Sequence, residues 1–127
     1  MKISEVKELE KITGQMEGLH KELSALARKS PNDGLNKFKL SLVNSALDQA
    51  TKILGEEYVP VAGFAQFDPD DLPTNSDVTL VIGQYLEELE RKRADNLKRD
   101  MGNWIYSLTD SMEKIRTAPP KKINEKK

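Results

Sequence analysis

The chain has 127 residues, a formal net charge of −1 at pH 7 and no cysteine. A chain of this length is expected to form one domain, its near-neutral charge gives no overall attraction to nucleic acid or membranes, and the lack of cysteine excludes disulfides and thiol chemistry. The 32% share of charged residues favours a helical protein with much solvated surface. No signal peptide or membrane span is recognised, so a cytoplasmic location is expected.

The first predicted element is a helix over about residues 3–28. Its apolar side chains recur at spacings of three and four, which is the heptad pattern of a helix with one apolar seam. The seam consists of Leu9, Ile12, Met16, Leu19, Leu23 and Leu26. Gly14 and Gly18 lie outside it, and each destabilises a helix by up to about 1 kcal/mol relative to alanine. Two interpretations stay open: the seam packs within the chain, or it binds a helix of a second copy or of another protein.

A second helix is predicted over residues 31–54. Ser30 is a candidate N-cap, and Pro31 suits the first helical position. Gly55 provides a C-terminal stop. Before it runs a broad apolar face that consists of Phe38, Leu42, Val43, Ala46, Leu47, Ala50, Ile53 and Leu54.

The stretch 55–77 combines aromatic, acidic and proline residues and has no basic residue. The prolines limit its conformations, so an ordered loop is expected rather than a flexible one. The candidate partner-binding residues here are Tyr58, Phe64, Phe67, Asp68, Asp70 and Asp71. The aromatic side chains either fill the end of the bundle or form a docking surface rimmed by acids. A calcium loop starting at Asp68 is not supported, since the glycine and glutamate positions of that motif are occupied by Pro73 and Thr79.

A third helix is predicted from Asp77 to Arg116, with cap residues just before it. A helix of forty residues exceeds the ordinary globular range, so a break near Asp95–Asn96 or Gly102 is the alternative to one rod. The β-branched run Val78–Ile82 also allows a short strand, paired with residues 58–61.

Trp104 is either a core residue or an anchor for assembly, because tryptophan is enriched at protein interfaces. We expect one helical domain over residues 1–117, followed by a basic, disordered tail over 118–127. Residues 56–77 carry six acidic and no basic groups, whereas residues 113–127 carry six basic and two acidic groups. The acidic loop and the basic tail are therefore expected to attract each other, and high salt should weaken that contact.

Catalytic patterns are weak throughout the chain. Glu87, Glu88 and Glu90 suggest the magnesium-holding acids of an all-α nucleotide hydrolase, but the basic run that begins at Arg91 makes intrahelical pairs such as Glu87–Arg91 and Glu88–Lys92 the simpler account. His20 is expected to be a boundary residue at the edge of the seam. No catalytic residue, metal ligand or cofactor is assigned.

The sequence therefore predicts an all-α fold: a small bundle with a heptad helix, a middle helix, an acidic-aromatic loop and a long or kinked C-terminal helix. The expected function is that of a non-catalytic interaction or regulatory protein, which assembles through apolar helix faces with another protein or as a homodimer. The alternatives are a nucleic-acid-associated regulator that uses the basic tail and an all-α metal-dependent nucleotide hydrolase.

Overall fold

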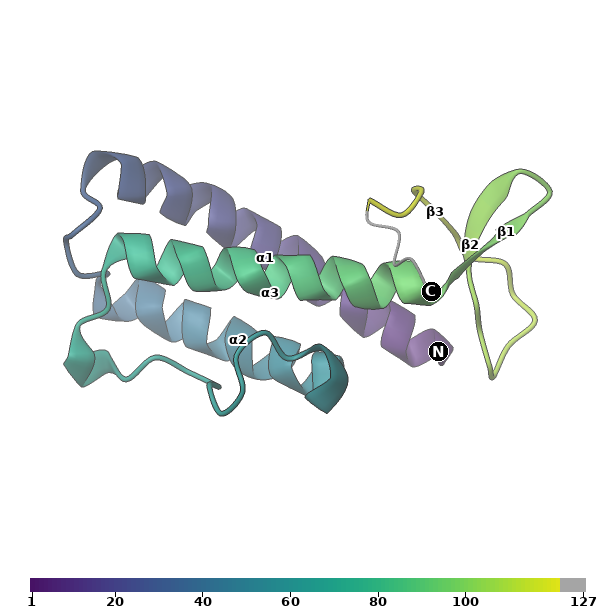
Figure 1. Ribbon diagram of the computed structural model, residues 1–127, viewed down its shortest axis with the longest axis horizontal. Helices are drawn as coiled ribbons and strands as arrows, with labels where there is room; N and C mark the ends of the chain where they lie inside the picture. Colours follow the sequence, from purple (N-terminus) through teal and green to yellow (C-terminus); the bar gives the residue numbers. More distant parts are fainter. Residues whose placement is uncertain (122–127) are drawn as a thin grey trace.

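The computed structural model describes residues 1–121, which form three helices and a small antiparallel sheet (Figure 1). The elements are α1 (Ile3–Lys29), α2 (Lys37–Tyr58), the 3-10 turn η1 (Pro69–Asp71), α3 (Asn75–Asp95), β1 (Leu97–Asp100), β2 (Asn103–Tyr106) and β3 (Arg116–Thr117). The helical class is confirmed in this coarse sense, but the sheet means that the fold is not purely all-α.

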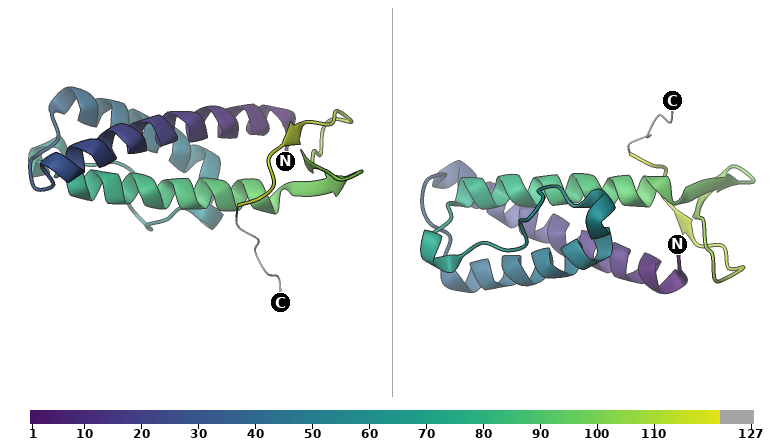
Figure 2. Two further views of the ribbon diagram at one scale, coloured as in Figure 1. Left: turned by 90° about the horizontal axis from the view of Figure 1, so that it is seen from above. Right: turned by 60° about the horizontal axis from the view of Figure 1, so that its bottom comes forward.

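The three helices lie side by side, with α1 running opposite to α2 and α3 (Figure 1). Because α2 and α3 are parallel, the chain between them has to return along the bundle, and Figure 2 shows this loop on its outside. The sheet extends beyond the end of the bundle at which α1 begins and α3 ends. In residues 1–121, no helix combines the length and the apolar character needed to cross a membrane.

The first helix follows its predicted bounds within one residue and places its seam in the core. Leu9, Ile12, Met16 and Leu23 are buried, and Leu19 and Leu26 are partly buried against the same core. The structure thus buries the seam inside the chain, as the first of the two interpretations requires.

The second helix begins six residues later than predicted. Asn36 is its N-cap, and the Asn36 Oδ1 atom accepts a hydrogen bond from the Lys39 amide at 2.8 Å. The residues from Pro31 onward do not start a helix because they pair with the chain before α3: the Leu35 amide donates to the Pro73 carbonyl at 3.0 Å. Backbone pairing between two distant segments has overridden a local capping signal.

Gly55 interrupts α2, as its residue type suggested, but the helix resumes for one more turn. Its φ of 66° lies in the left-handed region that favours glycine. The extra turn brings Tyr58 under the C-terminal end of α3.

The start of α3 confirms the predicted cap. The Thr74 hydroxyl oxygen accepts from the Asp77 amide at 3.1 Å. Residues 78–82 are helical, so the alternative of a strand there is wrong. The helix ends at Asp95, so of the alternatives that the sequence left open the structure shows the one at Asp95–Asn96. The Asn96 side chain donates to the Lys92 carbonyl at 2.8 Å.

Beyond this break the predicted helix is wrong, because residues 97–117 form the sheet. Leu97 pairs with Tyr106 and Asp100 with Asn103 across a two-residue turn. Both turn residues, Met101 (φ 50°) and Gly102 (φ 85°), have positive φ, the geometry that matches the twist of a β-hairpin. Glycine at the second turn position adopts this positive φ without a steric penalty. The chain therefore turns back here and does not continue as the helix that the apolar spacing predicted.

The sheet is attached to the bundle from both sides. Tyr106 is buried in the main core, and the Met1 carbonyl accepts a hydrogen bond from the Thr109 amide at 2.9 Å. The hairpin is therefore fixed to the N-terminal end of α1.

Candidate protein-interaction surface

Tyr58 is the most buried of the partner-binding residues predicted in the stretch 55–77. Its hydroxyl donates to the Asp95 Oδ2 atom at 2.5 Å and joins the ends of α2 and α3. Burial, followed by the hydrogen bond to Asp95 and the charge of that residue, raises the pKa of Tyr58 well above its usual value. The side chain holds the bundle end together and does not project outward.

Phe64 and Phe67 also turn toward the bundle. Their rings meet edge to face with centroids 5.1 Å apart, and both are partly buried against the core. The Asn44 side chain donates to the Phe67 carbonyl at 2.9 Å and accepts from the Phe67 amide at 2.8 Å. The Asn44 side-chain amide thus pairs with the loop backbone as a neighbouring strand would and holds the loop against α2. This arrangement agrees with the interpretation in which the aromatic side chains cover the bundle.

The acids of this loop lie on the surface. Asp68 caps η1 by accepting from the Asp70 amide at 2.9 Å, and Asp70 and Asp71 are exposed. Within residues 1–121, no group of three histidine, cysteine, aspartate or glutamate side chains is placed to hold a metal ion. The remainder of the basic tail, 122–127, lies outside the described residues, so its attraction to this loop stays a prediction.

Trp104 lies in the second strand and not on a helix. It is partly buried, and the Arg99 guanidinium lies 5.5 Å from its ring centroid on the neighbouring strand. This cation–π contact is a cross-strand pair of the kind that stabilises hairpins.

An apolar groove between α1 and α2 is open on the surface, and we name it the α1–α2 groove. Its volume is about 100 Å³, and its lining consists of Leu19, Glu22, Leu23, Phe38, Lys39, Leu42 and Val43. Phe38 is 72% exposed and Leu42 is 46% exposed. On its rim the Lys39 ammonium and the Glu22 carboxylate form an ion pair at 3.0 Å.

The other large exposed apolar side chains of residues 1–121 do not share a groove of this kind. Leu80 lies on α3, Met101 is at the hairpin turn, Met112 lies between β2 and β3, and Val61 and Leu72 belong to the loop. Single exposed apolar residues are normal on protein surfaces, whereas neighbouring ones mark contact sites.

Of the groove residues, Leu19 and Leu23 were among the predicted contact residues. Phe38 and Leu42 were assigned to the apolar face of the second helix. In the structure, the buried positions of α2 run in steps of three and four residues through Leu40, Val43, Leu47, Ala50 and Leu54. Phe38 and Leu42 fall beside that row, and the sequence alone does not show which of the two apolar rows is covered.

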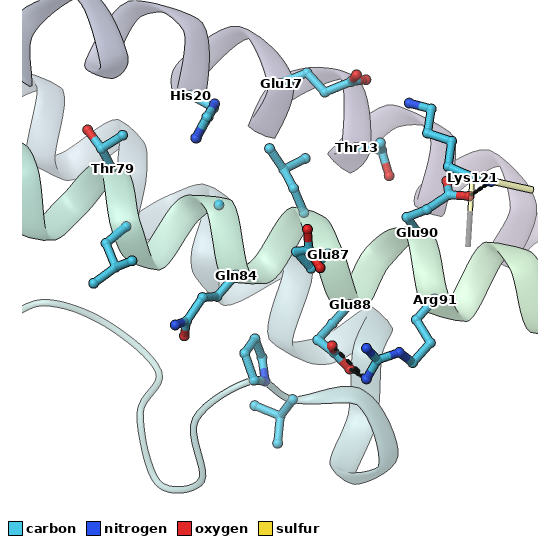
Figure 3. Close-up of a pocket in the computed structure, with 15 residues that line it drawn as sticks. Thr13, Glu17, His20, Thr79, Gln84, Glu87, Glu88, Glu90, Arg91 and Lys121 are labelled. Carbon is cyan, nitrogen blue, oxygen red and sulfur yellow. Dashed lines mark hydrogen bonds and ion pairs between the residues drawn. The ribbon is translucent and has the colours of Figure 1, made fainter. Parts of the chain in front are cut away.

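A second, larger depression follows the outer side of α3, and we name it the α3 cleft (Figure 3). It has a volume of about 1110 Å³ and includes Thr13, Glu17 and His20 of α1, Gly83, Glu87 and Glu90 of α3, and Lys121. A methyl group added at Gly83 would lie 3.4 Å from the His20 Nε2 atom, so His20 rests on the glycine where α1 and α3 approach. His20 is a boundary residue, as expected.

The charged residues of α3 pair at a spacing of three, not four as predicted. Glu88 binds Arg91 at 2.9 Å and Glu90 binds Arg93 at 2.8 Å, while the Lys92 ammonium donates to the Ile53 carbonyl. Glu88 and Glu90 are therefore held in ion pairs within the helix, although these are not the pairs that the sequence predicted.

The pair formed by Glu90 and Arg93 also fixes residues 117–121 on α3. Arg93 donates to the Thr117 hydroxyl at 2.9 Å and to the Pro119 carbonyl at 2.9 Å, and Glu90 accepts from the Lys121 amide at 2.9 Å. Burial would raise the pKa of Glu90, but hydrogen bonds from Arg93 and Lys121 and their charges lower it on balance. The pKa of Arg93 is raised, first by its bond to Glu90. The first residues of the predicted tail are thus held in place.

In comparisons with known proteins, no family model matches the chain, and no curated protein or solved structure is significantly similar to it. The α1–α2 groove and the α3 cleft are therefore the features of the molecule that bear on its function.

Proposed function

We propose that the protein is a non-catalytic interaction protein and that the α1–α2 groove is its contact surface for another protein chain. The observation that carries this proposal is the exposure of Phe38, at 72%, beside Leu42 in a groove whose other wall is Leu19. Leaving an aromatic ring in water forgoes a large hydrophobic gain. An aromatic anchor next to an apolar pocket, with charges at the rim, is the usual anatomy of a protein contact.

The chemistry of the groove favours a protein as its occupant. Its two charged residues, Glu22 and Lys39, neutralise each other, so it lacks the excess of positive charge that phosphate backbones require. Its remaining lining is aliphatic and aromatic, without groups that would activate a nucleophile or hold a cofactor. The α3 cleft is a weaker candidate for a contact site, because two of its acids on α3, Glu88 and Glu90, form pairs with basic residues of the same helix.

The proposal is tested by photo-cross-linking in living cells. A photoreactive phenylalanine derivative replaces Leu42 in the groove or, for comparison with the α3 cleft, replaces Leu80, which lines that cleft and is 62% exposed on α3. Irradiation is expected to give a discrete protein adduct at position 42 and none of comparable yield at position 80. A chain that gives no adduct at position 42, or equal adducts at both positions, contradicts the proposed function.

A further inference from the structure

We infer that the occupant of the α1–α2 groove is a second copy of this chain, related to the first by a two-fold axis; this inference rests on the proposed function. A two-fold contact uses the same patch on both molecules, so the patch has to complement itself. The α1–α2 groove meets this condition because it carries its own projection and its own recess: Phe38 stands 72% exposed beside the hollow formed by Leu19, Leu23 and Leu42. Phe38 of each copy then enters the recess of the other.

The charges at the rim satisfy the same symmetry. Glu22 lies on α1 and Lys39 on α2, so a two-fold axis through the groove brings the acid of each copy toward the base of the other. Within one chain this ion pair is partly solvated, with side-chain exposures of 60% for Glu22 and 32% for Lys39. A solvated pair stabilises a fold very little, and its members are therefore free to exchange partners at an interface.

Gly18 gives independent support for the close approach of another helix. It lies one turn before Glu22 on α1, and a methyl group placed there would meet nothing within 4 Å in its own chain. Glycine weakens a helix, and the packing inside the chain gives no reason for it at this position. The closely approaching α2 of a second copy supplies a reason, since small residues let helix backbones come together.

The test exchanges the charges on separate chains. Glu22→Lys gives a chain with two basic rim residues, and Lys39→Glu gives a chain with two acidic ones. Each variant alone is expected to dissociate roughly tenfold more readily than the wild type, because like charges then face each other across the axis. An equimolar mixture is expected to recover wild-type association, since both contacts between the two chains are again attractive, although the pair inside each chain remains repulsive.

Sedimentation equilibrium measures association, and native mass spectrometry with one chain labelled with 15N shows whether the recovered dimer contains one copy of each variant. Circular dichroism of each variant checks that the helices are intact. A mixture that stays as dissociated as its components overturns the inference, as does a wild-type chain that remains monomeric at every accessible concentration. If position 42 cross-links in cells to a protein of a different mass while the purified chain stays monomeric, the inference fails and the proposed function stands.

Discussion

The two sides of α1 differ in how completely the chain covers its own apolar surface. On the side facing the core, Ile12 and Met16 are at most 1% exposed. On the side that faces the first turn of α2, Leu19 is only partly buried, and the neighbouring Phe38 of α2 is largely exposed to water. The comparison teaches that the inner side of α1 makes the fold, whereas its outer edge, shared with α2, stays partly uncovered and is the surface that we propose for a partner.

The contrast predicts its largest effect for substitutions on the inner side. Met16→Ala removes a fully buried side chain and is expected to lower the free energy of unfolding by about 2–5 kcal/mol, because the transfer energy is lost and a cavity remains. Phe38→Ala, measured in dilute solution where the chain is monomeric, should change it by no more than about 0.5 kcal/mol. Urea unfolding followed by circular dichroism compares the two, and equal losses would contradict the proposed division of α1.

A smaller effect is expected where residues 117–121 are held on α3. Arg93→Gln removes the donors to Thr117 and Pro119 and should cost about 1–3 kcal/mol, since Glu90 is left without its charged partner. Arg91→Gln is the matched control, because Arg91 pairs only with Glu88 among the contacts identified for it. Trypsin cleavage after Arg116 should accelerate in the first variant and not in the second.

The pair formed by Glu90 and Arg93 should also make the free energy of unfolding depend on pH. The pKa of Glu90 is lowered in the folded protein, so its stabilising contribution is present above the usual carboxyl value of 4.5 and is lost as pH falls through the folded value. Arg93→Gln should reduce this acid-induced loss. If both proteins lose the same stability on acidification, Glu90 does not depend on Arg93.

The bond between Tyr58 and Asp95 should contribute less. Tyr58→Phe is expected to lower the free energy of unfolding by about 1 kcal/mol at neutral pH, the usual value of one hydrogen bond. Because burial and Asp95 raise the pKa of Tyr58, this contribution is present below the unfolded value of 10.0 and declines as pH rises above it. Thermal unfolding at neutral pH and at about pH 11 should therefore show a narrower gap between wild type and variant at the higher pH. A gap that is constant with pH argues against this linkage.

The smallest expected effect is that of Gly18→Ala, which should change the stability of the monomer and the association of two copies in opposite directions. Gly18→Ala should stabilise the monomer by up to about 1 kcal/mol, because alanine favours the helix and nothing in the chain obstructs its methyl group. The same methyl group should weaken association of two copies. Gly14→Ala, one turn farther from the groove, is the control that should stabilise the chain without affecting association. Thermal unfolding and sedimentation measure the two quantities, and a Gly18→Ala chain that associates more tightly argues against close helix packing there.

Much of the helical bundle is predictable from the sequence because its signals are local. The seam of the first helix and the Thr74 cap each follow from spacing or capping within a few residues. The late start of α2 is not predictable in this way, because residues 31–35 are held by Pro73 and its neighbours some forty positions away.

The sheet was missed because its residues also satisfy a helical spacing. Leu97, Met101, Trp104 and Ile105 fit a helix face, but the pairing of Leu97 with Tyr106 depends on a turn at Gly102. The groove was missed for a related reason. The apolar face of a helix does not by itself show which of its residues the rest of the fold covers. Phe38 fits the broad apolar face of the second helix and still finds no neighbour to cover it.

The most direct test of the central claim is sedimentation equilibrium of the wild type, Phe38→Ser and Leu80→Ser. The wild type and Leu80→Ser are expected to show twice the mass of one chain, and Phe38→Ser the mass of a single folded chain with an unchanged circular dichroism spectrum. If Phe38→Ser remains as associated as Leu80→Ser, the α1–α2 groove is not the contact surface.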